Sequence, residues 1–218
     1  MNPSFFTKHK LALLLFSFFV LTVTTSAQTL KDVFTNSASQ VLYLGIDFTK
    51  FKVIDEPTAN ATDIRERQYA GINDLIINEA KKYDLKSAFQ RNEMDHDISF
   101  VAERNSKANI ADIVSTNTAD YHRLKDSDIE SLVKGFSFGG KKGIGLLFVA
   151  EAMSKSEKSI AVWVTLIDMG SRKILMTERL EGKLAGFGFR NYVGGGIKSV
   201  IDQIEKKKYK EWKGKFDH

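Results

Sequence analysis

Apolar positions along the chain follow two periods, and these periods predict strands and helices. The segment 41–48 is almost continuously apolar and rich in β-branched and aromatic residues, which predicts a strand covered on both faces. In 49–53 apolar residues alternate with lysines, so the same strand is expected to run on, half-exposed, until Pro57 stops it. Apolar residues then recur every three or four positions from Asp63 to Tyr83, which predicts an amphipathic helix lying on the sheet.

The second half of the chain predicts hairpins. Strands are expected at 144–153, 160–168 and 172–180, and their short polar or glycine-containing connections indicate antiparallel pairing. Charged residues in the third strand predict that it lies at an edge of the sheet. Weaker patterns predict a strand at 98–102, a short helix or turn at 110–114, a helix at 127–135 and a last helix through 197–204.

This order of elements predicts an α+β fold with a single mixed, largely antiparallel sheet and helices packed mainly on one face. The chain of 218 residues is long enough for one domain with a substantial core. We expect that domain at 41–205, after a flexible segment at 28–40 and before a basic tail at 206–218.

Residues 1–27 have the pattern of a signal peptide. A short basic patch at 8–10 precedes an apolar run at 11–23, and small residues follow at 25–27. The apolar run is shorter than the roughly 20 residues that a membrane-spanning helix needs. We therefore expect cleavage near Ala27–Gln28 and export of the remainder to the periplasm or the exterior.

Composition narrows the function of the exported part. The chain has no cysteine, which excludes both a disulfide framework and lipid attachment through a thiol at the new amino terminus. Removal of the leader leaves 30 basic and 27 acidic side chains, a balance that does not indicate nucleic-acid binding. Six glycines in 182–196 precede a helix, but their spacing does not match a nucleotide-binding loop, so no cofactor is predicted.

One polar cluster has the residue types of a metal site. Its candidate ligands are Glu93, Asp95, His96 and Asp97, with His122 and Asp126 further along the chain. Neighbouring residues point apart in a strand or turn, and no pair of histidines has helical spacing, so the sequence predicts a solvated turn and no metal.

A second candidate function is catalysis by carboxylates. The exported part has neither a thiol nor a Gly-x-Ser-x-Gly motif for nucleophilic catalysis. Asp47 with Glu151, or Glu151 with Asp168, could flank a glycosidic bond if the fold brought them together. The alternative is therefore an exported hydrolase that acts on glycans or peptides through carboxylates.

Two features are candidate docking sites for a partner protein. The segment 182–196 is expected to be a flexible link, and Phe187, Phe189, Arg190 and Tyr192 lie within it, tucked onto the core or exposed to a partner. The predicted edge strand carries Lys173 and Arg179 and could accept a partner strand. The expected partners are envelope proteins or a second copy of the chain.

The basic tail is a third candidate surface. Its lysines alternate with aromatic residues, a pattern that can lie on an anionic membrane surface. A solvated helix end, stabilised by cations near its carboxyl terminus, gives the same pattern. The residues concerned are Lys206, Lys207, Lys208, Tyr209 and Trp212.

The segment 143–205 resembles the exported envelope domains typified by the curli-secretion lipoprotein, the lipoprotein activators of peptidoglycan synthases and the amino-terminal domain of TolB. The matching features are a buried strand at 145–150, a strand that ends at 166–168, a glycine-containing turn, a strand at 173–177 and a last helix; 42–48 and the helix from Asp63 are similar to that family's opening strand and helix. The chain lacks the family's lipid-bearing cysteine and a carboxy-terminal propeller. The resemblance implies a non-catalytic adaptor that contacts envelope proteins or assembles into a ring, and we predict such a binding or assembly module.

Overall fold

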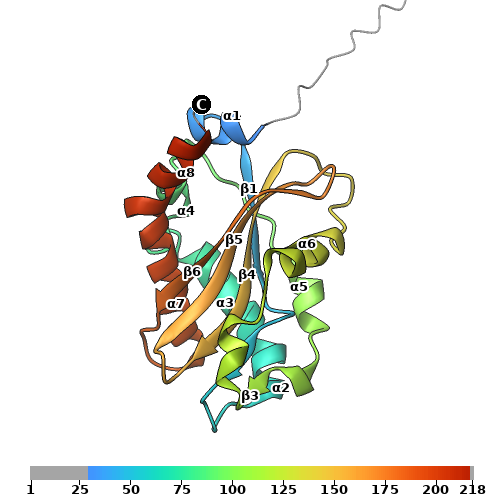
Figure 1. Ribbon diagram of the computed structural model, residues 1–218, viewed down its shortest axis with the longest axis vertical. Coiled ribbons are helices and arrows are strands. Elements are labelled where there is room, and N and C mark those ends of the chain that lie inside the picture. The colour runs from blue at the N-terminus through green and yellow to red at the C-terminus, as the bar shows by residue number, and fades with distance from the viewer. Residues whose placement is uncertain (1–28, 217–218) are drawn as a thin grey trace, which may run out of the picture.

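The computed structural model describes residues 29–216 (Figure 1). The expected signal peptide at 1–27 lies outside these residues. In chain order the elements are α1 (Leu30–Thr35), β1 (Val41–Asp47), β2 (Lys52–Ile54), α2 (Ala61–Asp63), η1 (Ile64–Gln68), α3 (Tyr69–Asn78), α4 (Leu85–Ala88), α5 (Ser99–Ser106), η2 (Ile110–Asp112), β3 (Val114–Ser115), η3 (Thr118–His122), α6 (Asp126–Lys134), β4 (Ile144–Ser154), β5 (Ser159–Asp168), β6 (Lys173–Lys183), α7 (Phe189–Gln203), η4 (Ile204–Lys208) and α8 (Tyr209–Phe216). Here η1 and η4 are π-helical turns, whereas η2 and η3 are 3₁₀ turns.

The strands form one mixed sheet in the order β3-β2-β4-β5-β6, with β1 also paired to β4. The long pairings β4–β5 and β5–β6 are antiparallel, whereas β1 and β2 run parallel to β4. The α+β fold class predicted from the sequence is confirmed, and β6 occupies the predicted edge position. The single strand predicted over 41–53 is divided into β1 and β2, because a turn that Phe51 N–H closes on the Phe48 carbonyl (3.0 Å) separates them.

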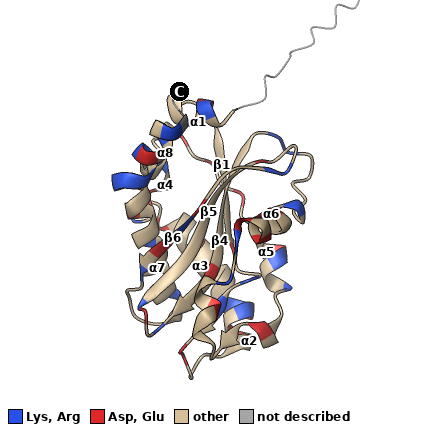
Figure 2. Cartoon of the chain, in the orientation of Figure 1, with Lys and Arg blue, Asp and Glu red and all other residues tan. Residues whose placement is uncertain are grey.

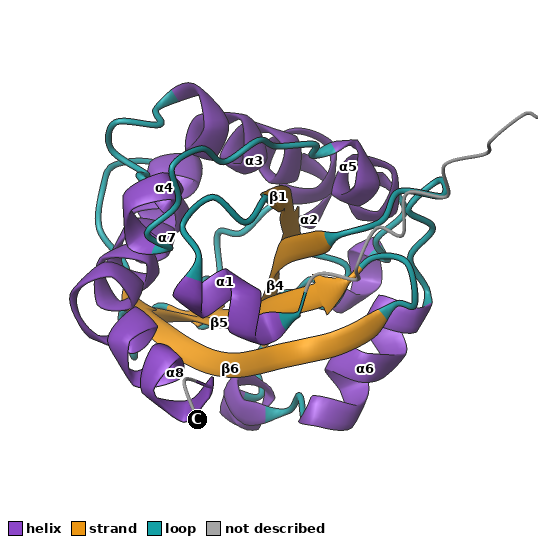
Figure 3. Cartoon of the chain, turned by 90° about the horizontal axis from the view of Figure 1, so that it is seen from above, coloured by secondary structure: helices purple, strands orange, loops and turns teal. Residues whose placement is uncertain are grey.

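Helices cover both faces of the sheet, and most of them lie on one. Alternate residues of β4 and β5 contact a large core formed by α1, α3, α4, α7 and α8. The other face carries a smaller core beneath α5 and α6. Seen from above, α3 and α7 lie on one side of the curved sheet and α6 on the other (Figure 3). The sequence correctly predicted helices mainly on one face.

The strand predicted at 98–102 is wrong, because these residues begin α5. Asp97 accepts hydrogen bonds from the main-chain N–H and the hydroxyl of Ser99, at 3.2 and 2.5 Å, and so fixes the first turn. Val101 and Asn105, four positions apart, then face β1 and are buried. Three alternating apolar residues were too few to distinguish this helix from a strand.

The flexible link predicted at 182–196 is also wrong. Gly182 lies in β6, and Gly194, Gly195 and Gly196 lie inside α7. A Cβ at Gly182 would stand 2.0 Å from the Gly196 carbonyl oxygen, and one at Gly195 would stand 2.0 Å from the Ala185 oxygen. The glycines therefore allow helix and strand backbones to touch, and only 184–188 remain as the connection.

The segment 28–40, predicted to be flexible, and the basic tail both contain packed helices. In α1, Val33 and Phe34 are buried, and in α8, Tyr209 and Trp212 are only 1% exposed. The Tyr209 hydroxyl donates to the Val33 carbonyl at 3.2 Å, and Phe34 and Tyr209 have ring centroids 5.3 Å apart. The predicted boundaries at 40 and 205 are therefore incorrect, because aromatic residues outside them complete the core. Within residues 29–216, no helix is both long and apolar enough to cross a bilayer.

Candidate functional site

A surface groove opens between two segments that are far apart in the sequence. It has a volume of 490 Å³ and lies between residues 56–64, before and within α2, and residues 186–192 at the start of α7. Apolar atoms come from Ala59, Ile64, Met153, Phe189 and Tyr192, and charged groups come from Glu56, Asp63 and Lys155. We call it the Phe187 groove, because Phe187 lines it and is 94% exposed.

The loop that carries Phe187 has a defined backbone. Gly186 and Gly188 have φ angles of 121° and 75°, a left-handed region that other residues adopt only with strain. Asn191 Nδ2 donates to the Phe187 carbonyl at 3.1 Å, and Tyr192 N–H donates to the Gly188 carbonyl at 2.9 Å. The aromatic ring of Phe187 is thus presented to solvent by a braced loop at the first turn of α7.

The structure unites part of the predicted aromatic site. Phe187, Phe189 and Tyr192 share the groove, and the last two are half-buried against the main core. Arg190 does not line the groove. Its side chain lies over α3, where a Cβ at Gly71 would be 3.2 Å from Arg190 Cδ. The opposite wall, residues 56–64, was not predicted, because more than a hundred residues separate it from the aromatic segment.

The edge of β6 is less open than the sequence suggested. Gln203 Nε2 donates to the Glu181 carbonyl at 2.7 Å, and the Lys183 N–H donates to Ser199 Oγ at 3.1 Å, so α7 covers the end of this edge. A register shift beside Leu175 interrupts the other end. Such bulges and covering side chains are the usual protections of an edge strand.

The two candidate cations of β6 lie in different environments. Arg179 Nε lies 2.7 Å from Glu151 Oε2, one Nη lies 2.6 Å from Glu181 Oε1, and the guanidinium lies 5.3 Å from the centre of the Tyr121 ring. This arginine therefore binds groups of its own protein. Lys173 is exposed at the start of the strand.

The tail residues divide into buried aromatics and exposed cations. Tyr209 and Trp212 are buried, so the predicted insertion of these rings into a membrane surface is wrong for this fold. Lys208 forms ion pairs with Glu178 and Glu211, at 2.7 and 3.0 Å. Lys206 and Lys207 are exposed, and Figure 2 shows both basic and acidic positions along this carboxy-terminal helix.

The candidate catalytic carboxylates are bound by groups of the protein itself. Asp47 and Glu151 are fully buried, and Arg104 Nε lies 2.8 Å from Asp47 Oδ2. Glu151 accepts from Arg179, from Trp163 Nε1 at 3.1 Å and from the Leu124 N–H at 2.7 Å. Asp168 accepts from the N–H groups of the turn that follows it. Asp47 and Glu151 thus each have an arginine partner, and nothing in the sequence indicated these partners.

The side chains considered as candidate metal ligands do not converge on one point. Asp97 pairs with Lys141 at 2.6 Å and with Ser99, and these interactions, with Lys141 first, lower the pKa of Asp97. In the part of the chain that the structure describes, no three histidine or acidic side chains are close enough to hold one ion.

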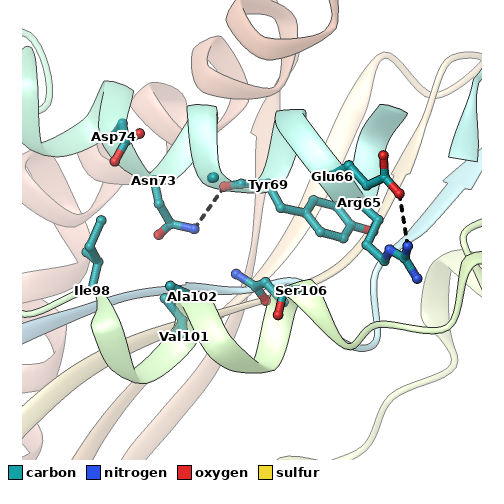
Figure 4. A pocket seen from close by; sticks show the side chains of 11 residues that line it. Arg65, Glu66, Tyr69, Asn73, Asp74, Ile98, Val101, Ala102 and Ser106 are labelled. Carbon is teal, nitrogen blue, oxygen red and sulfur yellow. Dashed lines mark hydrogen bonds and ion pairs between the residues drawn. The ribbon is translucent and has the colours of Figure 1, made fainter. Parts of the chain in front are cut away.

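A second pocket of 300 Å³ lies between α3 and α5 (Figure 4). Its polar floor is formed by Asn73 and Asn105, whose amides bind the β1 backbone. Arg65 and Glu66 form an ion pair with N and O 3.1 Å apart at one end. Burial, with a smaller contribution from Asp47, raises the pKa of Tyr69 far above its usual range, and the hydroxyl has no hydrogen-bond partner. Of the other polar side chains that line the pocket, Ser106 donates to the Glu103 carbonyl at 2.8 Å, and Asp74 is exposed.

The fold and the groove define an α+β protein that presents an aromatic side chain beside a surface groove. Neither a protein-family model nor a curated protein matches the chain. Among solved structures, it is similar to the crystal structure of lipoprotein GNA1162 from Neisseria meningitidis, with 17% identity over 78% of this chain and 98% of that one. The TM-score is 0.30, a likeness too low to define the fold or the function of this chain.

Proposed function

We propose that this protein is an exported, non-catalytic binding module of a bacterial cell envelope, which docks a partner protein in the Phe187 groove. The observation that carries the proposal is the 94% exposure of Phe187 on a loop whose backbone is braced by Asn191. A large ring held in water costs free energy, which burial against a partner recovers. Anchoring aromatics of this kind dominate the energetics of protein interfaces.

The lining of the groove suggests the chemistry of the partner. Ile64, Met153 and Tyr192 offer an apolar floor, while Lys155 and Glu56 already form an ion pair with N and O 2.7 Å apart at the rim. Because these charges neutralise each other, the groove favours an apolar side chain of the partner over a charged one. We therefore expect a partner segment that places an apolar residue beside Phe187.

Export is supported by the signal-peptide pattern of residues 1–27. Thr29 caps α1 through a reciprocal pair of hydrogen bonds with Asp32. Cleavage near Ala27–Gln28 leaves this cap intact. The buried, arginine-bound states of Asp47 and Glu151 support a non-catalytic role.

Site-specific photocrosslinking in the native host tests the proposal. A photoreactive phenylalanine analogue replaces Phe187 in one strain and Lys134, an exposed residue on the opposite helix layer, in another. We expect a discrete covalent adduct at position 187, identified by mass spectrometry, and none at position 134. Export is checked in the same strains by the mass of the purified chain. An absent adduct at 187, or equal adducts at both positions, contradicts docking through the groove.

A further inference from the structure

A depression on the other side of the molecule gathers cations from three separate segments. It has a volume of 460 Å³ and lies between the turn after β1, α5 and α6. Lys50, Arg104 and Arg123 line it together with apolar atoms of Leu124 and Leu132. We call it the basic depression. It shares no residue with the Phe187 groove.

The two arginines of the basic depression are fixed in place. Arg104 binds Asp47, lies over the Phe136 ring with its guanidinium carbon 4.1 Å from the centroid, and donates to the Gly135 carbonyl at 3.3 Å. One terminal nitrogen of Arg123 donates to the Lys50 carbonyl. These contacts orient both guanidinium groups before any ligand arrives, so little side-chain entropy is lost on binding.

The positive charge of the depression is not balanced. Asp47 neutralises Arg104, but within residues 29–216 neither Lys50 nor Arg123 has a carboxylate partner. The Nε of Arg123 is buried and has no acceptor. Asp128 is the acidic residue of the lining, and its carboxylate accepts the Lys125 N–H at 2.9 Å. That hydrogen bond leaves the charge of Asp128 in place, so the three cations outnumber the carboxylates of Asp47 and Asp128 by one, and a bound anion balances this excess.

We propose that the basic depression binds the phosphate group of a small organic phosphate or of a phospholipid headgroup. Guanidinium groups match the geometry of a phosphate through paired N–H donors, and an ammonium such as that of Lys50 adds a point charge. The volume exceeds that of a bare oxyanion and lies within the range of small-molecule sites. The apolar atoms of Leu124 and Leu132 accommodate the organic part of the ligand.

Binding is measured on the full chain by isothermal titration calorimetry at constant ionic strength. The soluble probes are inorganic phosphate and glycerol 3-phosphate, and sedimentation with phosphatidylglycerol–phosphatidylcholine vesicles tests the lipid source. The decisive variant is Lys50→Gln, because the Lys50 side chain makes no contact that the fold requires. The matched control is Lys210→Gln, which removes an exposed lysine of α8. Arg123→Gln is a second variant, accepted only if its thermal midpoint is unchanged.

We expect saturable binding of at least one phosphate probe, weakened about tenfold by Lys50→Gln, as loss of one charge-assisted hydrogen bond requires. Lys210→Gln should leave the affinity unchanged. Binding of glycerol 3-phosphate identifies a free organic phosphate as the ligand, and Lys50-dependent binding confined to vesicles identifies a lipid headgroup. Absence of saturable binding to every probe, or equal weakening by both lysine variants, overturns the proposal.

Discussion

Asn73 and Asn105 donate to the same acceptor, the main-chain carbonyl of Ile46, at 3.1 and 2.9 Å. Asn73 Oδ1 also accepts the Ile46 N–H, and Asn105 Oδ1 accepts the Phe48 N–H, both at 2.7 Å. Both amides are buried between β1 and its neighbouring helices. At the carboxyl end of β1 they satisfy main-chain groups that face away from β4, so side chains of α3 and α5 take the place of a further strand there. Nearer the start of β1, the main chain of Tyr43 bonds to that of Asp95 and Asp97.

Removal of one of these amides should be costly. Asn105→Ala leaves the Phe48 N–H buried without an acceptor, and we expect the free energy of unfolding to fall by about 1–3 kcal/mol. Urea denaturation followed by circular dichroism measures the change. Asn92→Ala, at an exposed position, is the matched control and should change stability little. Equal effects of the two substitutions would contradict the role assigned to Asn105.

The contact between α7 and β6 should reject any side chain at Gly182. A methyl group there would meet the Gly196 backbone at 2.0 Å, so we expect Gly182→Ala to destabilise the protein by about 3 kcal/mol or to prevent folding. Gly214, in α8, has no neighbouring atom within 4 Å of an added Cβ. Gly214→Ala should therefore stabilise by about 0.5–1 kcal/mol. The two thermal midpoints should move in opposite directions, and a shift in the same direction would show that the glycines do not act through this contact.

Phe187 and Phe189 should respond differently to truncation. Phe187→Ala removes an exposed ring and should change the free energy of unfolding by less than about 0.5 kcal/mol. Phe189→Ala removes a ring packed on the core and should cost about 1 kcal/mol or more. Chemical denaturation of both variants provides the measurement. A large loss of stability in Phe187→Ala would assign that ring to packing and weaken the docking proposal.

Acid should weaken the attachment of α8. Burial alone would raise the pKa of Glu178, but hydrogen bonds from Lys208 and Trp212 overcome this effect and lower it beneath its ordinary value of 4.5. A carboxyl group with a depressed pKa stabilises the fold above its unfolded-state pKa, and that stability is lost as the pH falls through the folded-state value. Glu178→Gln should therefore reduce the loss of stability below about pH 4.5, where the unfolded-state group titrates. Thermal midpoints measured from pH 7 to pH 3 give the comparison, and parallel profiles for the two proteins would exclude Glu178 as a contributor.

The sequence predicted those parts of the fold whose signals are local. The apolar runs of β4 and β5 and the charged pattern of β6 are strong local patterns, and the structure contains all three strands. The short pattern at 98–102 is ambiguous between strand and helix, and the hydrogen bond from the Ser99 N–H to Asp97 favours the helical turn. The glycines of α7 were read as a flexible link because their close approach to β6 is a tertiary contact.

The candidate sites likewise combine residues that a local pattern predicts with residues that only the fold brings together. Phe187, Phe189 and Tyr192 are close in sequence and were recognised, but the wall formed by residues 56–64 depends on the fold. Lys50, Arg104 and Arg123 stand alone in unrelated segments, so no local pattern could have joined them. The arginine partners of Asp47 and Glu151 could not be predicted for the same reason, because they are distant in the sequence.

The packing of α1 against α8 makes completion of the fold depend on the last helix that the structure describes. Arg91 links the carbonyl of Asn36 to the hydroxyl of Tyr209, at 2.8 Å in each case. A chain that emerges amino terminus first, from a ribosome or a translocation channel, cannot seal this side of its interior until α8 has followed. Loss of α8 would expose Val33, Phe34 and Phe89 to water, and such a product would be a ready substrate for quality-control proteases.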